Sequence, residues 1–246
     1  MGGSSLPPLR GLPRAFVPGL PDPLEEYFDL PKEEYDKFHK VLRMASGDRV
    51  AVLTGDGRLV TCELVGRGCQ PLETLRPQTE SQRSVVLALG LPKPDNLEES
   101  VRMATEMGVS KFVVFPADRS VVKWDSGKAE QKTERLKRIA REAAEVSFRA
   151  RLPAIVWRQS LAALLEEHPT AIVLSEVEGI GQTLSNAIGS MDPSAEIVLM
   201  IGPEGGWAPR EVALIGARAV TLGPRVLRVD TAAAAACALA LLQGGA

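Results

Sequence analysis

The stretch VLMIGPEGGWAPREVALI, from Val198 to Ile215, decides the fold of this chain. It begins with an apolar run typical of a buried strand, passes through a glycine-rich turn, and continues as a helical pattern that starts near Pro209. Turns of this kind usually bind phosphate through their backbone amides. This turn contains no lysine and carries a carboxylate, Glu204, which repels phosphate. The pattern therefore predicts a ligand without a phosphate group.

S-adenosylmethionine meets that description, because it has an adenine, a ribose and a sulfonium cation but no phosphate. The glycines of the turn allow the backbone to approach such a ligand closely. A second interpretation is that Glu204 only accepts hydrogen bonds from backbone amides at the start of the following helix. The two roles can coexist.

Outward from this turn, the chain from Ser84 onward alternates between short apolar strands and helices. Such alternation predicts an α/β domain with a mostly parallel sheet covered by helices on both faces. Strands are expected at 84–89, 111–115, 154–157, 171–175, 196–201 and 219–223, and helices at 96–108, 128–147, 161–168, 209–217 and 231–242.

The N-terminal part has a different pattern, with strand signals on either side of one expected helix at 31–45. Strands are expected at 14–17, 49–66 and 71–75, with Asp56-Gly57 as a hairpin turn. This pattern predicts a small barrel or curled sheet. The polar stretch 75–83 marks the boundary, so we expect one domain over 1–78 and a second over 79–246.

The composition limits the possible partners and chemistry. The formal net charge is −2, so any nucleic acid has to be bound by local basic patches rather than by a global positive field. Three cysteines, none in a C-x-x-C pair, favour a reducing, cytoplasmic compartment. With only two histidines and no H-E-x-x-H motif, a metal site is not expected, and no apolar run reaches the length of a membrane span.

Other ligand-binding motifs are absent or incomplete. The chain has no G-x-x-x-x-G-K-[ST] phosphate loop. The stretch VEGIGQTLSN, Val177 to Asn186, lacks the third glycine of a dinucleotide-binding motif, because Leu184 occupies that position. A plain loop after a strand is expected there. The missing glycine argues against a nicotinamide-dependent oxidoreductase.

A second informative stretch is VTLGPRVLRVDTAAAAACALALL, from Val220 to Leu242. Its loop leads into a helix that is apolar almost all round and should be buried, with Asp230 or Thr231 as the expected cap. Together with IGPEGGWAPREV about 20 residues earlier, this stretch resembles the bacterial 16S ribosomal RNA uridine-N3 methyltransferases. These enzymes belong to the SPOUT class of knotted methyltransferases.

Four further segments extend the resemblance over nearly the whole chain. They are PRAFV (13–17), FHKVLRMASGDRV (38–50), ATEMGVSKFVVFPADRSVVK (104–123) and AREAAEVSFRARLPAI (140–155). The chain departs from the family pattern at Phe148, where a glycine is common, and at Asp230, where a glutamate is usual.

The resemblance implies a particular architecture and cofactor. The fold would be an α/β SPOUT methyltransferase domain with a C-terminal trefoil knot, preceded by a small PUA-like β-barrel domain that binds RNA. The protein would be a homodimer that binds S-adenosylmethionine in the knot. The expected cofactor-binding residues are Leu174, Ser175, Ile201, Gly202, Glu204, Gly206, Leu222, Gly223, Arg225, Val226, Leu227 and Arg228.

Methylation of uridine at N3 requires alignment with the methyl donor and stabilisation of the deprotonated imide. We expect Arg228 to provide the stabilisation, and Asp230 to accept the proton or to orient another group. For Asp230, a role as helix cap is the alternative. Both residues lie in the loop before the last helix.

The implied substrate is 16S ribosomal RNA of the small ribosomal subunit, with the target uridine unstacked into the pocket. Arginine suits phosphate because its planar fork donates two parallel hydrogen bonds. The expected RNA-binding residues are Arg149 and Arg151 first, and then Arg14, Lys40, Arg43, Arg119 and Lys123.

Two other functions remain open on the sequence alone. The chain could be a SPOUT methyltransferase that acts on transfer RNA or on another ribosomal RNA site. It could also be a ribosome-binding RNA module without catalysis, which predicts that it does not bind S-adenosylmethionine.

Overall fold

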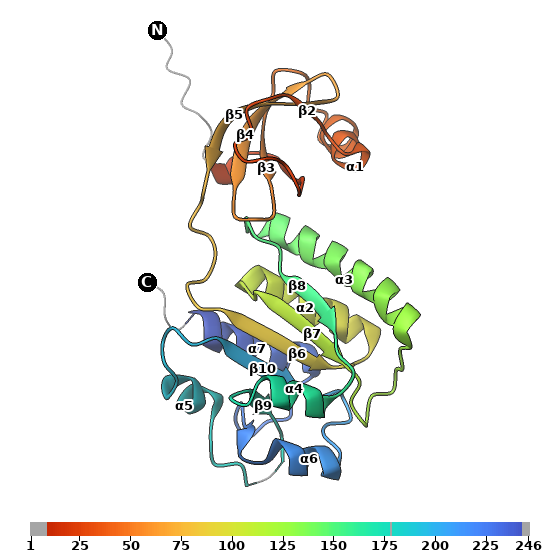
Figure 1. Cartoon of the computed structure of the whole chain (residues 1–246), viewed down its shortest axis with the longest axis vertical. Coiled ribbons are helices and arrows are strands. Elements are labelled where there is room, and N and C mark those ends of the chain that lie inside the picture. The colour runs from red at the N-terminus through yellow and green to blue at the C-terminus, as the bar shows by residue number, and fades with distance from the viewer. Residues whose placement is uncertain (1–8, 178, 243–246) are drawn as a thin grey trace. The chain divides into compact units, whose positions relative to one another are not determined.

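Two sheets organise the chain, and each belongs to its own unit (Figure 1). The computed structural model describes residues 9–177 and 179–242. Within these, the first unit comprises the residues up to Glu80 together with Ala144–Leu152, and the second comprises Ser81–Ala143 and the residues from Pro153 onward. The outer ends of the two expected domains, 1–8 and 243–246, lie outside the described residues.

The first unit is built on a curled five-stranded sheet in the order β1-β3-β4-β5-β2. A short 3-10 turn, η1 (Leu9–Gly11), precedes β1 (Arg14–Phe16), which pairs in parallel with β3 (Arg49–Leu53). The antiparallel neighbours that follow are β4 (Leu59–Val65), β5 (Gly68–Leu75) and β2 (Phe28–Asp29). The expected curled sheet and its central hairpin are therefore present.

The helical stretch within 31–45 is shorter than expected and changes from α-helical to π-helical winding along its length. It begins as α1 (Lys32–Asp36), continues as the π-helical segment η2 (Lys37–Val41), and is followed by Arg43 at a φ of 56°. A residue at positive φ cannot continue a right-handed helix, so the helical stretch ends here. An apolar stripe of Tyr35, Phe38, Val41, Leu42 and Met44 was expected on this helix; Phe38 is fully buried in the core of the first unit, but Val41 and Leu42 are exposed because they lie where the helical stretch ends.

The segment Ala144–Leu152 belongs to the first unit and is held there by several contacts, among them backbone hydrogen bonds from the amide of Gly57 to the carbonyl of Ala150 and from the amide of Leu152 to the carbonyl of Gly55. Glu80 accepts hydrogen bonds from the backbone amides of Ala150 at 3.1 Å and Arg151 at 3.0 Å, and from Nη2 of Arg149 at 2.7 Å. Beside these bonds, Phe148 is buried in a cluster with apolar residues of β1, β3 and β4. The local sequence pattern gives no sign of this association, because the partners are about 70 residues apart.

Phe148 adopts a backbone conformation that suits glycine, with a φ of 62°. The departure from the family pattern thus falls at a position where a side chain is strained. The ring is nevertheless buried, and the guanidinium carbon of Arg14 lies 4.9 Å from its centroid. Burial and this cation–π contact offset the strain of a bulky residue at positive φ.

The second unit is built on six parallel strands in the order β11-β9-β10-β6-β7-β8. The central strands are apolar on both faces, as expected for a sheet covered on both sides. The strands are β6 (Val85–Gly90), β7 (Lys111–Phe115), β8 (Ala154–Trp157), β9 (Ile172–Leu174), β10 (Ile197–Ile201) and β11 (Ala219–Val220).

Helices cover both faces of this sheet, and the expected mixed α/β fold is confirmed (Figure 1). One face packs against α2 (Pro94–Met107), α3 (Ser126–Val146), α5 (Leu184–Gly189) and α7 (Val229–Leu242). The other face packs against α4 (Leu161–Glu167) and α6 (Pro209–Ile215), and the 3-10 turn η3 (Gly216–Arg218) follows α6.

Two local expectations in this unit are wrong. A short helix, α5, forms where a plain loop was expected, because the side chain of Thr183 accepts a hydrogen bond from the amide of Asn186 and caps it. The last helix begins at Val229, so Asp230 and Thr231 lie in its first turn and do not precede it as caps. A carboxylate in that turn still interacts favourably with the helix dipole.

Within the described parts of the chain, no helix combines the length and apolar character needed to cross a bilayer. Nor do residues 9–177 and 179–242 bring together three or more His, Cys, Asp or Glu side chains in a way that could hold a metal ion.

Candidate functional site

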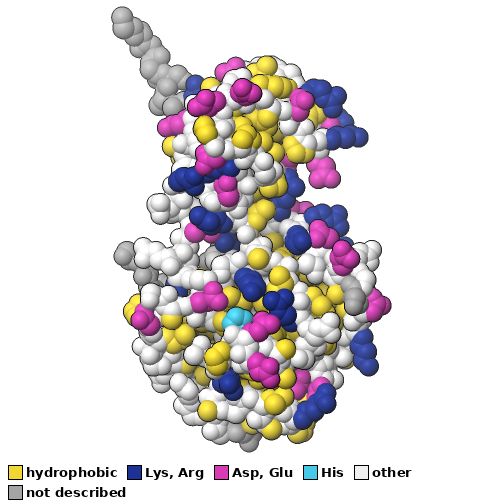
Figure 2. All heavy atoms as spheres, viewed as in Figure 1, with side chains coloured by type: hydrophobic (Ala, Val, Ile, Leu, Met, Phe, Trp, Pro, Cys, Tyr) yellow, Lys and Arg dark blue, Asp and Glu magenta, His cyan; other side chains and the backbone are white. Residues whose placement is uncertain are grey.

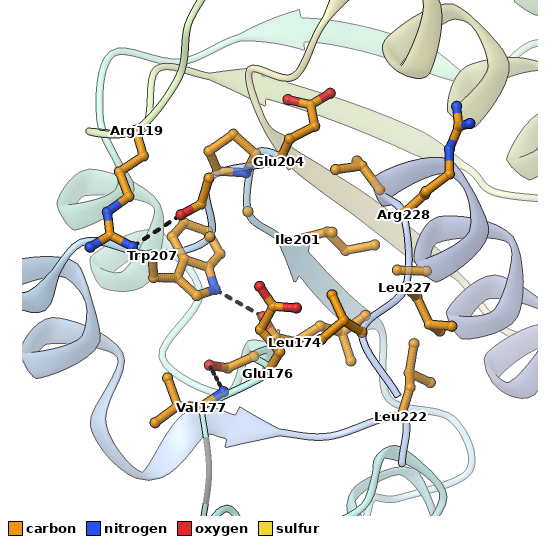
Figure 3. A pocket seen from close by; sticks show the side chains of 18 of the residues that line it. Arg119, Leu174, Glu176, Val177, Ile201, Glu204, Trp207, Leu222, Leu227 and Arg228 are labelled. Carbon is orange, nitrogen blue, oxygen red and sulfur yellow. Dashed lines mark hydrogen bonds between the residues drawn. The ribbon is translucent and has the colours of Figure 1, made fainter. Parts of the chain in front are cut away.

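A cavity of about 500 Å³ lies in the second unit, at the carboxyl edge of its parallel sheet (Figure 3). Because parallel strands end at the same edge, the loops that follow β9, β10 and β11 meet there. The start of α2 and the start of α7 complete the wall through Asn96, Val229 and Ala232. The topology of the sheet thus creates the site.

With the exception of Gly223, every residue expected to bind the cofactor lines this cavity. Gly223 instead forms a turn at a φ of 115°, and its amide donates to the hydroxyl of Thr221 at 3.0 Å. The residues that the structure brings together are Leu174, Ser175, Ile201, Gly202, Glu204, Gly206, Leu222, Arg225, Val226, Leu227 and Arg228.

The glycine-rich turn after β10 is packed tightly against a tryptophan that sequence analysis did not select. A Cβ atom on Gly202 would lie 3.0 Å from the ring of Trp207, closer than real Cβ atoms normally approach. The ring is buried, and its Nε1 donates a hydrogen bond to the carbonyl of Leu174 at 2.8 Å. Gly202 is therefore needed for packing within the protein as well as for ligand approach.

A second glycine of the turn is held by the loop after β7. A Cβ atom on Gly205 would lie 2.9 Å from Cβ of Arg119, and Nη1 of Arg119 donates to the carbonyl of Gly205 at 3.0 Å. Two residues of α6 fix the same loop. The Arg210 guanidinium hydrogen-bonds to Asp118 and lowers the pKa of that carboxyl, and the buried Glu211 accepts from the amide of Asp118 at 3.0 Å. These contacts fix the position of Arg119 in the cavity wall.

The two carboxylates of the cavity wall point in different directions. Oε1 of Glu204 accepts hydrogen bonds from the amide of Lys93 at 2.9 Å and from Nδ2 of Asn96, so this carboxylate is directed at the start of α2. Figure 3 shows Glu204 turned away from Leu174 and Glu176 directed into the cavity. Among the described residues, no hydrogen bond or ion pair is recorded for the carboxylate of Glu176.

The expectation that Glu204 accepts hydrogen bonds from amides at the start of the following helix, α6, is therefore wrong, because its partners lie at the start of α2. The start of α6 is bonded by Glu211, whose carboxylate accepts from the amide of Ala208 at 2.8 Å. Glu204 instead accepts a hydrogen bond from the amide that precedes α2, more than 100 residues earlier in the chain.

The two residues expected to be catalytic lie next to each other. Nε of Arg228 donates to Oδ1 of Asp230 at 3.2 Å, and Nη2 of Arg228 donates to Oδ1 of Asn96 at 3.0 Å. The Arg228 side chain lines the cavity and is 73% exposed, so it can meet a large ligand. The same Oδ1 of Asp230 accepts from the amide of Thr231, and Asp230 is not part of the cavity wall.

The expected RNA-binding residues are divided between the two units. Arg119 and Lys123 are exposed in the second unit, while Lys40, Arg43 and Arg151 are exposed in the first. On the face drawn in Figure 2, Lys and Arg side chains are interspersed with Asp and Glu rather than gathered in one patch. A basic patch large enough to identify an interface by itself is not seen on that face.

Two of the expected RNA-binding arginines have partners within the first unit. Arg149 is only 3% exposed and pairs with Glu80, so its guanidinium is not accessible to a phosphate. Arg14 donates from Nη1 to the carbonyl of Glu145 at 3.2 Å and from Nη2 to that of Arg10 at 2.7 Å. These contacts favour structural roles for both residues.

Sequence reasoning missed Asn96, Glu176 and Trp207 as parts of the site. A signal for Asn96 and Glu176 was available, because each follows the end of an expected parallel strand, and such ends share one edge. Trp207 directly follows the glycine turn in the sequence, but its contact with the end of β9 depends on the strand order, which the sequence does not show.

The chain is similar in sequence to known proteins. Residues 79–241 match the model of a family described as RNA methyltransferase domain. The ribosomal RNA small subunit methyltransferase E of Bacillus subtilis (strain 168) is 35% identical over 219 residues, covering 83% of this chain and 86% of that protein. The protein of the same name from Synechocystis sp. is 35% identical over 208 residues, covering 81% and 67%.

A solved structure agrees with the fold over both units. The crystal structure of a ribosomal RNA small subunit methyltransferase E from Neisseria gonorrhoeae bound to S-adenosyl methionine matches with a TM-score of 0.80 and 25% identity. The match covers 92% of this chain and 95% of that one.

Proposed function

The chain belongs to the RNA methyltransferase family that includes the ribosomal RNA small subunit methyltransferases E, and from this premise we propose that it methylates N3 of a uridine in 16S ribosomal RNA. The methyl donor is S-adenosylmethionine, which the similar protein from Neisseria gonorrhoeae binds. The observation that carries the proposal is the cavity at the carboxyl edge of the sheet, which the glycine turn and the Arg225–Arg228 loop enclose.

The residues of the cavity fit this cofactor. A volume of about 500 Å³ is within the usual range for small-molecule sites. Leu174, Ile201 and Leu222 offer apolar contacts for an adenine, and the wall carries the carboxylates of Glu176 and Glu204 beside its arginines, which suits a ligand with a sulfonium cation. Bound S-adenosylmethionine supplies a methyl group that is activated by its sulfonium charge.

The protein has two tasks in this reaction. It must hold the uracil in line with the methyl group, and it must stabilise the negative charge that develops on the imide when N3 loses its proton. Arg228 is the group proposed for the second task, since its guanidinium is at the cavity wall and largely exposed.

For Asp230 we propose the orienting role rather than that of proton acceptor. Its Oδ1 already accepts from Nε of Arg228 and from the amide of Thr231. Because Asp230 is also not part of the cavity wall, it acts on the base through Arg228. The proton leaves to solvent at the open mouth of the site.

Three wider proposals follow from the family. The chain around the cavity forms a trefoil knot of the SPOUT class, which is supported by the convergence of three successive loops and the packing of α7 on α2. The curled sheet of the first unit is a PUA-like barrel that binds RNA. The protein works as a homodimer in the cytoplasm, where it meets the small ribosomal subunit. Light scattering on the purified chain measures whether it is a dimer.

Mass spectrometry of 16S ribosomal RNA nucleosides tests the function directly. In a strain that lacks the gene, 3-methyluridine should disappear from 16S RNA and return when the gene is restored. Loss of a methylated nucleoside from transfer RNA or from the large subunit instead would identify a SPOUT enzyme with another substrate. If titration calorimetry detects no binding of S-adenosylmethionine, the chain is a non-catalytic RNA module.

Glu176 is expected to contribute to cofactor affinity, because it is the carboxylate directed into the cavity. Changing Glu176 to Gln removes the charge and keeps the size, and should weaken binding of S-adenosylmethionine about tenfold, as expected for a hydrogen bond to a charged group. Calorimetry measures the affinity, and Glu166→Gln on α4, exposed and outside the cavity, is the control. Equal affinities of the Glu176→Gln variant and the wild type would refute the assignment.

Arg151, an exposed arginine of the first unit, is expected to contact RNA phosphate. Arg151→Ala should weaken RNA binding and reduce the slope of log affinity against log salt by about 0.7, the value for one phosphate contact on a single strand. Filter binding between low and moderate salt measures the slope. Arg102→Ala on α2 of the second unit is the matched control for loss of one exposed arginine, and an unchanged slope for Arg151→Ala would count against this contact.

A further inference from the structure

We propose that Asn96 is the residue that positions Arg228 toward the reacting base, as the middle member of a hydrogen-bonded chain that runs from Glu204 to Asp230. The inference rests on the proposed methyl transfer at the same cavity. Asn96 belongs to neither of the two stretches that identified the site, and its part in the wall follows from the structure alone.

The helix α2 fixes the place of Asn96. Pro94 is the first residue of this helix, and Asn96 follows two positions later, in the first turn. The hydroxyl of Ser100 donates to the carbonyl of Asn96 at 2.6 Å, and the amide of Leu97 donates to the carbonyl of Lys93 at 3.0 Å. The backbone of Asn96 is therefore anchored, and its half-buried side chain faces the cavity.

Glu204 determines which way the amide group of Asn96 is turned. A carboxylate can only accept, so it must face the NH2 end of the amide, and Nδ2 of Asn96 donates to its Oε1. The second bond to Oε1, from the amide of Lys93, holds the carboxylate in place. With Nδ2 fixed in this way, the oxygen of Asn96 is left to face Arg228.

Arg228 is held by two acceptors at two of its nitrogens. Oδ1 of Asn96 accepts from Nη2 at 3.0 Å, and Oδ1 of Asp230 accepts from Nε at 3.2 Å. Two bonds along one side of a planar guanidinium define its plane, whereas one bond to Asp230 alone leaves an exposed side chain free to rotate. No residue within 9–177 and 179–242 accepts a hydrogen bond from Nη1, so its donors can meet a ligand.

This chain of hydrogen bonds gives Glu204 a role in orienting Asn96, although the Glu204 carboxylate is turned away from Leu174 (Figure 3). The glycine turn, the start of α2 and the loop before α7 come from distant parts of the sequence, and the Glu204–Asn96–Arg228 bonds join all three. Asn96 acts through Arg228 and is a positioning residue rather than a catalytic one.

A double-mutant cycle on the full-length protein tests the proposal. Asn96→Ala should lower the single-turnover rate roughly ten- to hundredfold, while the affinity for S-adenosylmethionine and the melting temperature stay close to wild type. In the Arg228→Ala background, adding Asn96→Ala should cause no further loss, because the two residues act as a unit. Asp95→Ala, exposed in the same helical turn and outside the cavity, should keep the wild-type rate.

A second variant covers the case in which Asn96→Ala folds poorly. Glu204→Ala removes the acceptor that orients the amide, and should lower the single-turnover rate without adding to the effect of Arg228→Ala. A full rate for Asn96→Ala, or a loss that multiplies with that of Arg228→Ala, would overturn the inference. A wild-type protein without methyl transfer would instead overturn the proposed function, so the two failures are distinguishable.

Discussion

Replacing Arg228 with alanine is expected to slow single-turnover methyl transfer by about two to three orders of magnitude, the typical loss when one preorganised donor to a developing anion is removed. The expectation follows from the charge that appears on the uracil when N3 loses its proton. Arg228 is at the cavity wall, with its guanidinium held by Asn96 and Asp230. A donor that is held in advance stabilises that charge without reorganisation.

The measurement separates binding from chemistry. Single-turnover incorporation of labelled methyl groups into RNA, with the enzyme in excess, reports the chemical step, while calorimetry reports the affinity for S-adenosylmethionine. Arg228→Lys keeps the charge but loses the planar fork that meets two acceptors, so its rate should lie between those of the wild type and Arg228→Ala. If Arg228→Ala reacts at the full rate with RNA binding intact, electrostatic stabilisation by this arginine is excluded.

The sequence predicted the second unit well because its strands are short apolar runs separated by helices with regular periodicity. Every expected strand of the parallel sheet is present, with ends that coincide or differ by at most three residues. What it did not predict was the order β11-β9-β10-β6-β7-β8, since strand order depends on long-range packing. The helix over 31–45 shows the same limit, because its periodicity predicted the buried Phe38 but neither the π-helical winding nor the exposure of Val41 and Leu42.

The candidate site was predictable where one short segment carries the information. The glycine turn indicated a close backbone approach, and the structure gives the reason at Gly202 and Gly205, where the Trp207 ring and Arg119 leave little room for a Cβ atom. Asn96 and Glu176 were missed because a single asparagine at the start of a helix, or a single glutamate in a loop, has no sequence pattern that marks it as part of a site. They become informative only when the strand order brings their loops to one edge.

The pair Arg149 and Arg151 shows most clearly what a sequence pattern cannot separate. The two arginines are two residues apart and of the same type, so both were expected to bind RNA. The structure places Arg149 in the interior, 3% exposed, and leaves Arg151 at the surface. What distinguishes them is Glu80, a residue of the segment between the two sheets.

Glu80→Ala is accordingly expected to destabilise the first unit by about 3 kcal/mol or more, the usual cost of removing one partner of a buried ion pair. The carboxylate accepts from Arg149 and from the amides of Ala150 and Arg151, so its loss also leaves these amides without that acceptor. The side chain of Arg149 is 4% exposed and cannot turn to water without disturbing the cluster around Phe148.

Urea denaturation of the whole protein measures this effect. Glu73→Ala removes an exposed carboxylate of β5 and should change the free energy of unfolding by no more than about 0.5 kcal/mol. Replacing both partners with apolar residues, Glu80→Leu with Arg149→Met, should recover part of the loss, because the cost of burying the two charges is then removed together with their attraction. The same logic separates the two arginines, since Arg149→Ala should destabilise the protein and Arg151→Ala should weaken RNA binding only. Equal stability of Glu80→Ala and the wild type would show that the other contacts of the 144–152 segment, its apolar packing and its backbone hydrogen bonds with Gly55 and Gly57, hold it without this carboxylate.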